Sequence, residues 1–283
     1  MIHMGSRARA AVVVALALLP GAAASQSVLL QIRPHIGDTL RMHLSQTVEM
    51  TGTTPGSTRT DPSRSMTTTI EVYTRAIAKQ WTAGGTLMQT ITDSVTMNPA
   101  SAASLADLKR RASEGKAAWI RVSGDGAVEV VDAGHPDTRE LRNLFGEMPA
   151  MLSRAVVAVG EKWTREMHIP LSGEQGAMGT VRATFQLDSL SRTGDLAFIS
   201  MKGTLSRVSL PGVVAPSAAY DASGTLTGTI QIDRRLGWIT DSRSTIVVRS
   251  TVVAAAARKG ETQRAPMLVR TRITQRIRAL PAR

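Results

Sequence analysis

Apolar and polar residues alternate along much of this chain, and a period of two is typical of half-buried β-strands. The first long example starts at Leu40, where even positions are mainly apolar and odd positions polar. The alternation resumes over 67–79 and 87–97, with a polar loop at 52–65 and a Gly-rich turn at 83–85 between the segments. Three strands joined in this way form an antiparallel meander.

The later part of the chain carries the same pattern. A hairpin is predicted over 119–131, and its turn at Gly124-Asp125-Gly126 lacks the further ligands of a calcium loop. Two stretches, 104–115 and 137–149, have capping residues and helical spacing of Leu, which predict short helices. The expected fold is mainly β: a large curved antiparallel sheet, as an open barrel or a sandwich, with two short inserted helices. The remaining predicted strands are 163–171, 181–191, 196–208, 224–232, 238–253 and 267–279.

The amino-terminal segment has the layout of a secretory signal peptide. Two arginines precede an apolar run over 10–19, the helix-breaking pair Pro20-Gly21 follows, and Ala22-Ala23-Ala24 offers the small residues of a cleavage site. The run is shorter than the roughly 20 residues of a membrane span, and no second candidate span follows. We expect residues 1–24 to be cleaved, residues 25–283 to form a single β-rich domain, and the protein to be exported, either periplasmic or extracellular.

The composition of the 283 residues removes several classes of function. Because the chain has no Cys, it has no thiol nucleophile, Cys zinc site, iron–sulfur cluster or lipidated amino-terminal Cys. Aromatic residues make up only 3%, which weighs against an outer-membrane barrel with aromatic girdles. A formal net charge of +12 predicts a basic surface.

No motif for catalysis or cofactor binding is found in the sequence. It has neither a Gly-x-Ser-x-Gly elbow nor a Gly-rich phosphate loop, and the histidines after residue 24 lack the close pair of a metal site. Glu161, Glu166 and His168 form the densest titratable group, either an acid/base pair or, as we expect, a cross-strand polar contact. No catalytic residue, metal ligand or cofactor is predicted.

Methionines on or beside the strands are candidates for contact with an apolar ligand, because Met adapts to irregular apolar surfaces. The tentative ligand-binding residues are Met42, Met50, Trp163 and Met167. The alternative, which we favour, is that such residues only fill the core.

The segment 267–279 has one apolar side and one side of arginines. Arg270, Arg272, Arg276 and Arg278 are the tentative polyanion-binding residues, for phosphate or lipid head groups. No aromatic residues interleave with them for base stacking, so nucleic acid is not an expected partner. The alternative is a solvated strand face whose charges prevent edge-to-edge aggregation.

Two similar motifs precede strands in the two halves of the chain. Ile36-Gly37-Asp38-Thr39-Leu40 resembles Val159-Gly160-Glu161-Lys162-Trp163, and a turn with Gly in a left-handed conformation would explain the pattern. One explanation is chance or shared turn chemistry. The other is a duplication that gives a pseudo-repeat of 36–131 and 159–279.

The Gly-Asp-x-Leu and Val-Gly-Glu-x-Trp motifs resemble those of an uncharacterised family of exported bacterial β-rich proteins, a domain of unknown function. The resemblance implies export and a large curved antiparallel sheet, similar to the open barrels of periplasmic lipoprotein carriers. It implies no catalytic residues.

These features favour an exported, non-catalytic protein that binds an apolar or amphipathic envelope molecule, such as a lipid, on the inner face of a curved sheet. One alternative is a structural or interaction module that docks polyanions or a protein partner through basic strand faces. Another is a hydrolase whose site forms only in three dimensions.

We expect the mature protein to begin at Ser25 or within a few residues of it, because Ala22-Ala23-Ala24 is the best cleavage site after the helix break. Amino-terminal sequencing of exported protein tests this expectation. Exported material that still begins with Met1 would contradict it.

Overall fold

The structure is a computed structural model that describes residues 27–53, 64–98, 117–132, 149–170, 178–208, 220–252 and 267–281. Every regular element within these ranges is a β-strand, so the described residues include no helix that could cross a membrane. The predicted signal peptide and the predicted helices at 104–115 and 137–149 lie outside the described residues, apart from Pro149, which is irregular.

Each segment that the sequence predicts as a strand is a strand in the structure, with bounds that differ by a few residues. Two short strands, β1 (Ser27–Val28) and β7 (Val157–Ala158), were not expected. The longer strands are β2 (Thr39–Thr53), β3 (Arg64–Thr82), β4 (Gly85–Asn98), β5 (Ala117–Val122), β6 (Val128–Asp132), β8 (Lys162–Pro170), β9 (Met178–Leu190), β10 (Leu196–Val208), β11 (Tyr220–Asp233), β12 (Trp238–Val252) and β13 (Met267–Leu280).

The eleven longer strands form one antiparallel sheet, in which two runs of consecutive strands meet at the centre. The strand order is β6-β5-β4-β3-β2-β13-β12-β11-β10-β9-β8, so the first and last long strands, β2 and β13, pair with each other. The sheet is not closed, and β6 and β8 are its two edges. This confirms the expected large open antiparallel sheet and makes β13 the sixth of its eleven strands.

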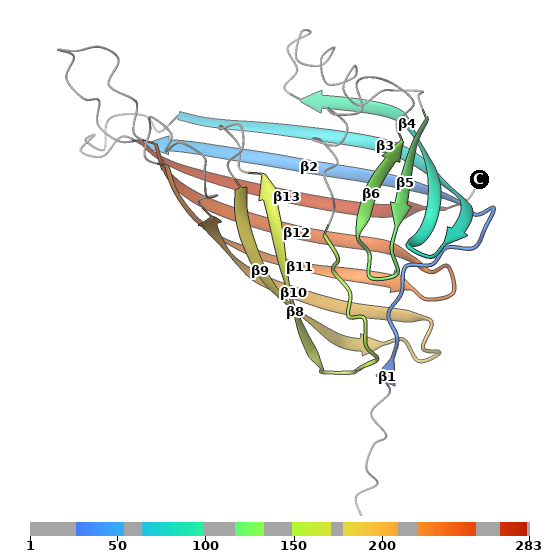
Figure 1. The fold of residues 1–283 in the computed structure, drawn as a ribbon. Coiled ribbons are helices and arrows are strands. Elements are labelled where there is room, and N and C mark those ends of the chain that lie inside the picture. Colours follow the sequence, from blue (N-terminus) through green and yellow to red (C-terminus); the bar gives the residue numbers. More distant parts are fainter. Residues whose placement is uncertain are drawn as a thin grey trace, which may run out of the picture.

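Cross-strand registry divides the sheet into an inner and an outer face. Residues paired across an antiparallel ladder lie on the same face, so Val72, Leu44 and Ile277 form a row across β3, β2 and β13 on the inner face. Figure 1 shows the sheet curved, with β5 and β6 in front of the long strands. The inner face is the concave one, because Met88 of β4 and Leu187 of β9 belong to one core cluster although six strands separate them in the sheet.

Glycines on the inner face of β11 help the sheet to curve. A Cβ atom on Gly228 would stand 2.3 Å from the carbonyl oxygen of Arg243 and 2.3 Å from Cε of Met201, its partner on β10. A Cβ atom on Gly224 would stand 2.5 Å from the carbonyl oxygen of Val247. The absent side chains therefore leave room on the concave side for larger residues of the neighbouring strands.

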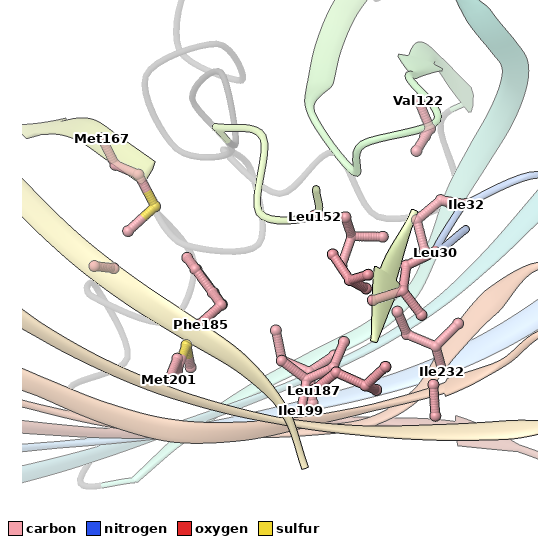
Figure 2. Packing of buried hydrophobic residues seen from close by; sticks show 14 of the residues in the cluster. Leu30, Ile32, Val122, Leu152, Met167, Phe185, Leu187, Ile199, Met201 and Ile232 are labelled. Carbon is pink, nitrogen blue, oxygen red and sulfur yellow. The ribbon is translucent and has the colours of Figure 1, made fainter. Parts of the chain in front are cut away.

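The amino-terminal segment 27–34, which we call the strap, covers part of the inner face. Its alternate residues Val28, Leu30 and Ile32 are buried in the core cluster. Leu152, from the irregular segment before β7, packs beside Leu30 and Ile32 (Figure 2). β1 of the strap pairs with β7, so the strap and this second segment form a single cover.

Two hairpin turns from different halves of the sheet hold the strap. The N–H of Ile32 donates to the carbonyl of Gly124 in the β5–β6 turn at 2.9 Å. The N–H of Arg33 donates to the carbonyl of Gly237 in the β11–β12 turn at 2.8 Å. The strap thus connects the two halves of the unclosed sheet at one end of its concave side, which we call the trough.

The two similar sequence motifs form turns with the same hydrogen bonds. Gly37 and Gly160 are both left-handed, with φ of 92° and 87°. In each turn the carboxylate accepts a hydrogen bond from the main-chain N–H three residues earlier, at 3.2 Å for Asp38 and 2.8 Å for Glu161. The glycine N–H and the carbonyl of the acidic residue also form hydrogen bonds to the main chain of a single residue on the neighbouring strand. That residue is Ala78 of β3 in the first turn and Leu187 of β9 in the second, with distances of 2.7 to 3.1 Å. The likeness of the motifs extends to their turn geometry, and a duplication remains a proposal.

We expect Gly160→Ala to lower the free energy of unfolding by about 1–2 kcal/mol, because an L side chain is strained at this φ. A Cβ atom there would meet no heavy atom within 4 Å, so the cost is one of backbone conformation alone. Gly124→Ala is the matched control, since that position is equally open and its φ is not left-handed. Equal urea midpoints for the two variants would contradict a left-handed conformation at Gly160.

Candidate functional site

The inward positions of β3, β2, β13 and β12 form a continuous surface without charge, which we call the central inner face. It consists of the even positions 66–76, the even positions 42–50, the odd positions 269–279 and the even positions 242–250. Every residue at these positions is apolar or an uncharged Thr, Ser or Gln. The charged residues of the same four strands between these limits lie on the outer face.

Most apolar side chains of the central inner face are only half-buried. Leu44, Val48 and Ile273 keep intermediate exposure, and Met66 at the end far from the strap is 54% exposed. By contrast, Phe185 and other inward residues on β9 to β11 are buried. A sheet face this apolar and this incompletely covered is a candidate surface for an apolar ligand.

A polar row crosses the central inner face. Gln46 on β2, Gln275 on β13 and Ser244 on β12 are registry partners, and all three are half-buried. The next inward row on one side, Val48, Ile273 and Ile246, is apolar, and on the other side Leu44 and Ile277 are the apolar neighbours on β2 and β13. The polar row offers hydrogen-bond donors and acceptors without any charge. Sequence reasoning missed these glutamines, although each occupies an inward position of its alternating segment.

The predicted ligand residues lie on the inner face but in two separate places. Met42 and Met50 belong to the central inner face, and the indole N–H of Trp238 donates to Sδ of Met42 at 3.3 Å. Trp163 and Met167 lie on β8, and five strands lie between β8 and β2 in the sheet order. Met167 is buried in the core cluster.

The side chain of Trp163 makes contacts within the fold. Its indole N–H donates to the carbonyl of Met151 at 2.8 Å, and its ring stacks on Phe185 with 5.8 Å between centroids. The side chain is half-buried and packs against the core cluster. These contacts tie the β8 edge to the segment that continues into β7.

Asp125 in the β5–β6 turn anchors that segment at the covered end of the trough. Its carbonyl accepts hydrogen bonds from the N–H groups of Met151 and Leu152, at 3.0 and 2.9 Å. Its carboxylate, whose side chain is 6% exposed, accepts hydrogen bonds from Ser123 and from Nε of Arg154 at 2.8 Å. Burial raises the pKa of Asp125, but these hydrogen bonds and the charge of Arg154 outweigh burial and bring its pKa below the usual value.

The predicted polyanion-binding arginines lie on the outer face of β13, opposite the central inner face. Arg276 pairs with Asp241 at 3.0 Å, and Asp241 also pairs with Arg243 at 3.2 Å. Arg270, Arg272 and Arg278 are exposed and form no ion pair within the described part of the chain. These three exposed arginines fit a solvated strand face, but β13 is the middle strand, so their charges do not lie at an edge of the finished sheet.

The two glutamates of the densest titratable group make other contacts in the described part of the chain. The carboxylate of Glu161 is used in its turn, and that of Glu166 lies 4.0 Å from Arg182 across the ladder. The side chain of His168 lies outside the described residues. Among the side chains that are described, no three His, Asp or Glu residues gather as metal ligands would.

Two open pockets are lined by Trp81 and by residues of the strap. One has a volume of about 400 Å³ and extends to Asp125 and Arg154, and the other has a volume of about 340 Å³ and extends to Arg235. Arg33 of the strap lies 4.6 Å from the centre of the Trp81 ring. Neither pocket is an enclosed apolar cavity, and neither is lined by a residue of the central inner face.

Comparisons with known proteins find a family match over part of the chain but no activity. A model of a family of unknown function (DUF6263) matches residues 136–239, which confirms the expected resemblance to an uncharacterised domain. No curated protein matches the chain. An outer membrane channel from Pseudomonas putida F1 aligns over 89% of this chain and 98% of its own, at 9% identity and a TM-score of 0.23, and a likeness this weak carries no argument.

We expect Asp125→Asn to lower the free energy of unfolding by about 1–3 kcal/mol at neutral pH, because the buried charge-assisted hydrogen bonds are weakened. A carboxyl whose pKa is lower in the folded state stabilises the fold above its unfolded pKa and loses that contribution as the pH falls. The difference between wild type and variant should therefore shrink below about pH 4.

Urea unfolding at neutral and acidic pH measures this difference. Asp188→Asn is the control, because that exposed carboxylate also accepts a hydrogen bond from a serine, Ser200, at 2.9 Å. It should change stability by less than about 0.5 kcal/mol. An equal loss in both variants would show that Asp125 has no anchoring role.

Proposed function

We propose that this protein binds an amphipathic molecule with apolar chains, such as a lipid of the cell envelope, along its central inner face. The observation that carries the proposal is the uncharged and half-buried surface of β3, β2, β13 and β12 on the concave side of an unclosed sheet. Export of the protein, which the amino-terminal segment predicts, belongs to the same proposal.

The shape of the central inner face supports a ligand with long apolar chains. Strands of this length extend over roughly 45 Å, and β2 has 15 residues and β13 has 14. Met42 and Met50 lie toward opposite ends of the inner row of β2, and flexible Met side chains suit chains of variable shape. The covered end, where Leu30, Ile32 and Leu152 are packed, limits the surface on one side.

The polar row supports an amphipathic rather than a purely apolar ligand. Gln46 and Gln275 face each other between β2 and β13, with apolar residues before and after them on each strand. An uncharged hydrogen-bonding group of the ligand, such as an ester or an amide, would satisfy these amides without bringing a charge into an apolar trough.

The experiment uses N-phenyl-1-naphthylamine, a fluorescent apolar probe, with the mature protein. Ile273→Glu places a carboxylate in the apolar row, and we expect it to weaken binding at least about tenfold, because burying an unpaired charge is costly. Thr274→Glu adds the same group to the outer face one residue later and should leave the affinity unchanged.

Thermal unfolding monitored by circular dichroism checks that both variants fold, and Ile273→Thr provides a milder change at the same position. Wild-type protein that does not bind the probe, or equal affinity in the wild type and all three variants, would overturn the proposal. Mass spectrometry of lipids extracted from protein purified from its native envelope then identifies the ligand.

A further inference from the structure

The outer face carries a line of arginines along its central strand, β13. Arg270, Arg272, Arg276 and Arg278 follow one another along β13, and we call this row the arginine ridge. β13 is the middle strand of a sheet that curves away on both sides, toward β6 and toward β8 (Figure 1). The ridge therefore lies along the outermost line of the convex face and extends over roughly 27 Å.

Arginines on the two neighbouring strands add to the charge of the ridge. Arg249 and Arg243 on β12 are the registry partners of Arg270 and Arg276, and Arg41 lies on β2. The outward positions of the three strands hold seven arginines but only two carboxylates, Asp241 and Glu49. Asp241 is already shared by two arginines, so most of the positive charge is uncompensated.

This arrangement is unfavourable for the isolated protein. Arg249 and Arg270 are directly opposite each other, where like charges destabilise a sheet. Neither forms an ion pair within the described residues, and both are exposed. An anionic partner would remove this repulsion. Arginine is also the side chain best suited to phosphate, because its guanidinium binds two phosphate oxygens at once.

We propose that the arginine ridge docks the protein on the surface of an anionic phospholipid bilayer. A convex sheet touches a plane along its central strand, which is where the ridge lies. A lipid surface supplies phosphate groups over the whole length of that contact, and its negative potential attracts clustered Arg and Lys. Contact along a single straight line matches a plane. The outward positions of β12 and β13 offer no aromatic residue between 241 and 278 for base stacking, and the nearest outward rings, His43 and Tyr73, already stack on each other with 4.4 Å between centroids.

Docking in this orientation leaves the central inner face turned away from the bilayer surface. The proposal is independent of ligand binding in the trough, because the ridge and the central inner face are on opposite sides of the same strands. The two can therefore fail separately in experiment.

The test measures co-sedimentation of the mature protein with vesicles. One set contains equal parts of phosphatidylcholine and phosphatidylglycerol, and the other contains phosphatidylcholine alone. We expect binding only to the anionic vesicles, and a loss of at least about tenfold in affinity between about 50 and about 200 mM salt, because each phosphate contact displaces counterions.

The ridge variant is Arg270→Gln, Arg272→Gln and Arg278→Gln, which leaves the paired Arg276 in place. It should lose at least about tenfold in affinity for anionic vesicles, while the thermal unfolding temperature does not fall and binding of N-phenyl-1-naphthylamine stays unchanged. The charge-matched control is Arg182→Gln, Arg192→Gln and Lys202→Gln, three exposed positions on or next to β9 and β10. It should keep nearly all vesicle binding.

Three results would overturn the proposal. Equal losses in both triple variants would show that net charge alone acts, without a docking surface. Equal binding of the wild type to both vesicle types would exclude head-group charge as the cause. Preference for soluble inorganic polyphosphate over vesicles at equal phosphate concentration would assign the ridge to a free polyanion instead of a membrane. The wild-type measurements decide the matter even where a variant fails to fold.

Discussion

An unclosed sheet cannot bury its inner face against itself, and this constraint shapes the whole molecule. A sheet needs a second layer to cover its apolar side, and here the strap and the segment before β7 supply one at one end of the trough. Leu30, Ile32 and Leu152 fill the space between side chains of both halves of the sheet (Figure 2). Where this cover is missing, the apolar positions of the central strands keep partial exposure.

The two faces of the central strands separate two kinds of chemistry completely. Strict alternation places uncharged side chains on one side of β13 and arginines on the other, so the charges cannot disturb the apolar surface. A one-residue shift in register would exchange the two faces. The turns before β2 and β8, each with a left-handed glycine and a carboxylate bound to the main chain, fix where those strands begin.

The strands were predictable from the sequence because period-two alternation is a local signal. The face occupied by Arg270 and by Ile273 followed from the same signal. The central position of β13 did not follow, because pairing of β2 with β13 joins segments more than 200 residues apart and no local pattern encodes it. The strap was also missed, although Val28, Leu30 and Ile32 alternate, because so short a run gives weak evidence for an element. The sequence indicates Met42 and Met50 of the candidate site because they are apolar, but it gives no such signal for Gln46 and Gln275, because glutamine at an inward position resembles an ordinary polar residue.

The pairing of β2 with β13 also has a consequence for the way the chain reaches its final form. One edge of β2 stays unpaired until β13 has been synthesised. The β2–β13 pairing is therefore also the slowest contact of the sheet to form. During that interval each half presents an open edge of main-chain donors and acceptors, which invites pairing with other chains. The repulsion among the arginines of β13 destabilises the folded protein. In the unfinished chain the same repulsion would prevent two copies from pairing through this strand.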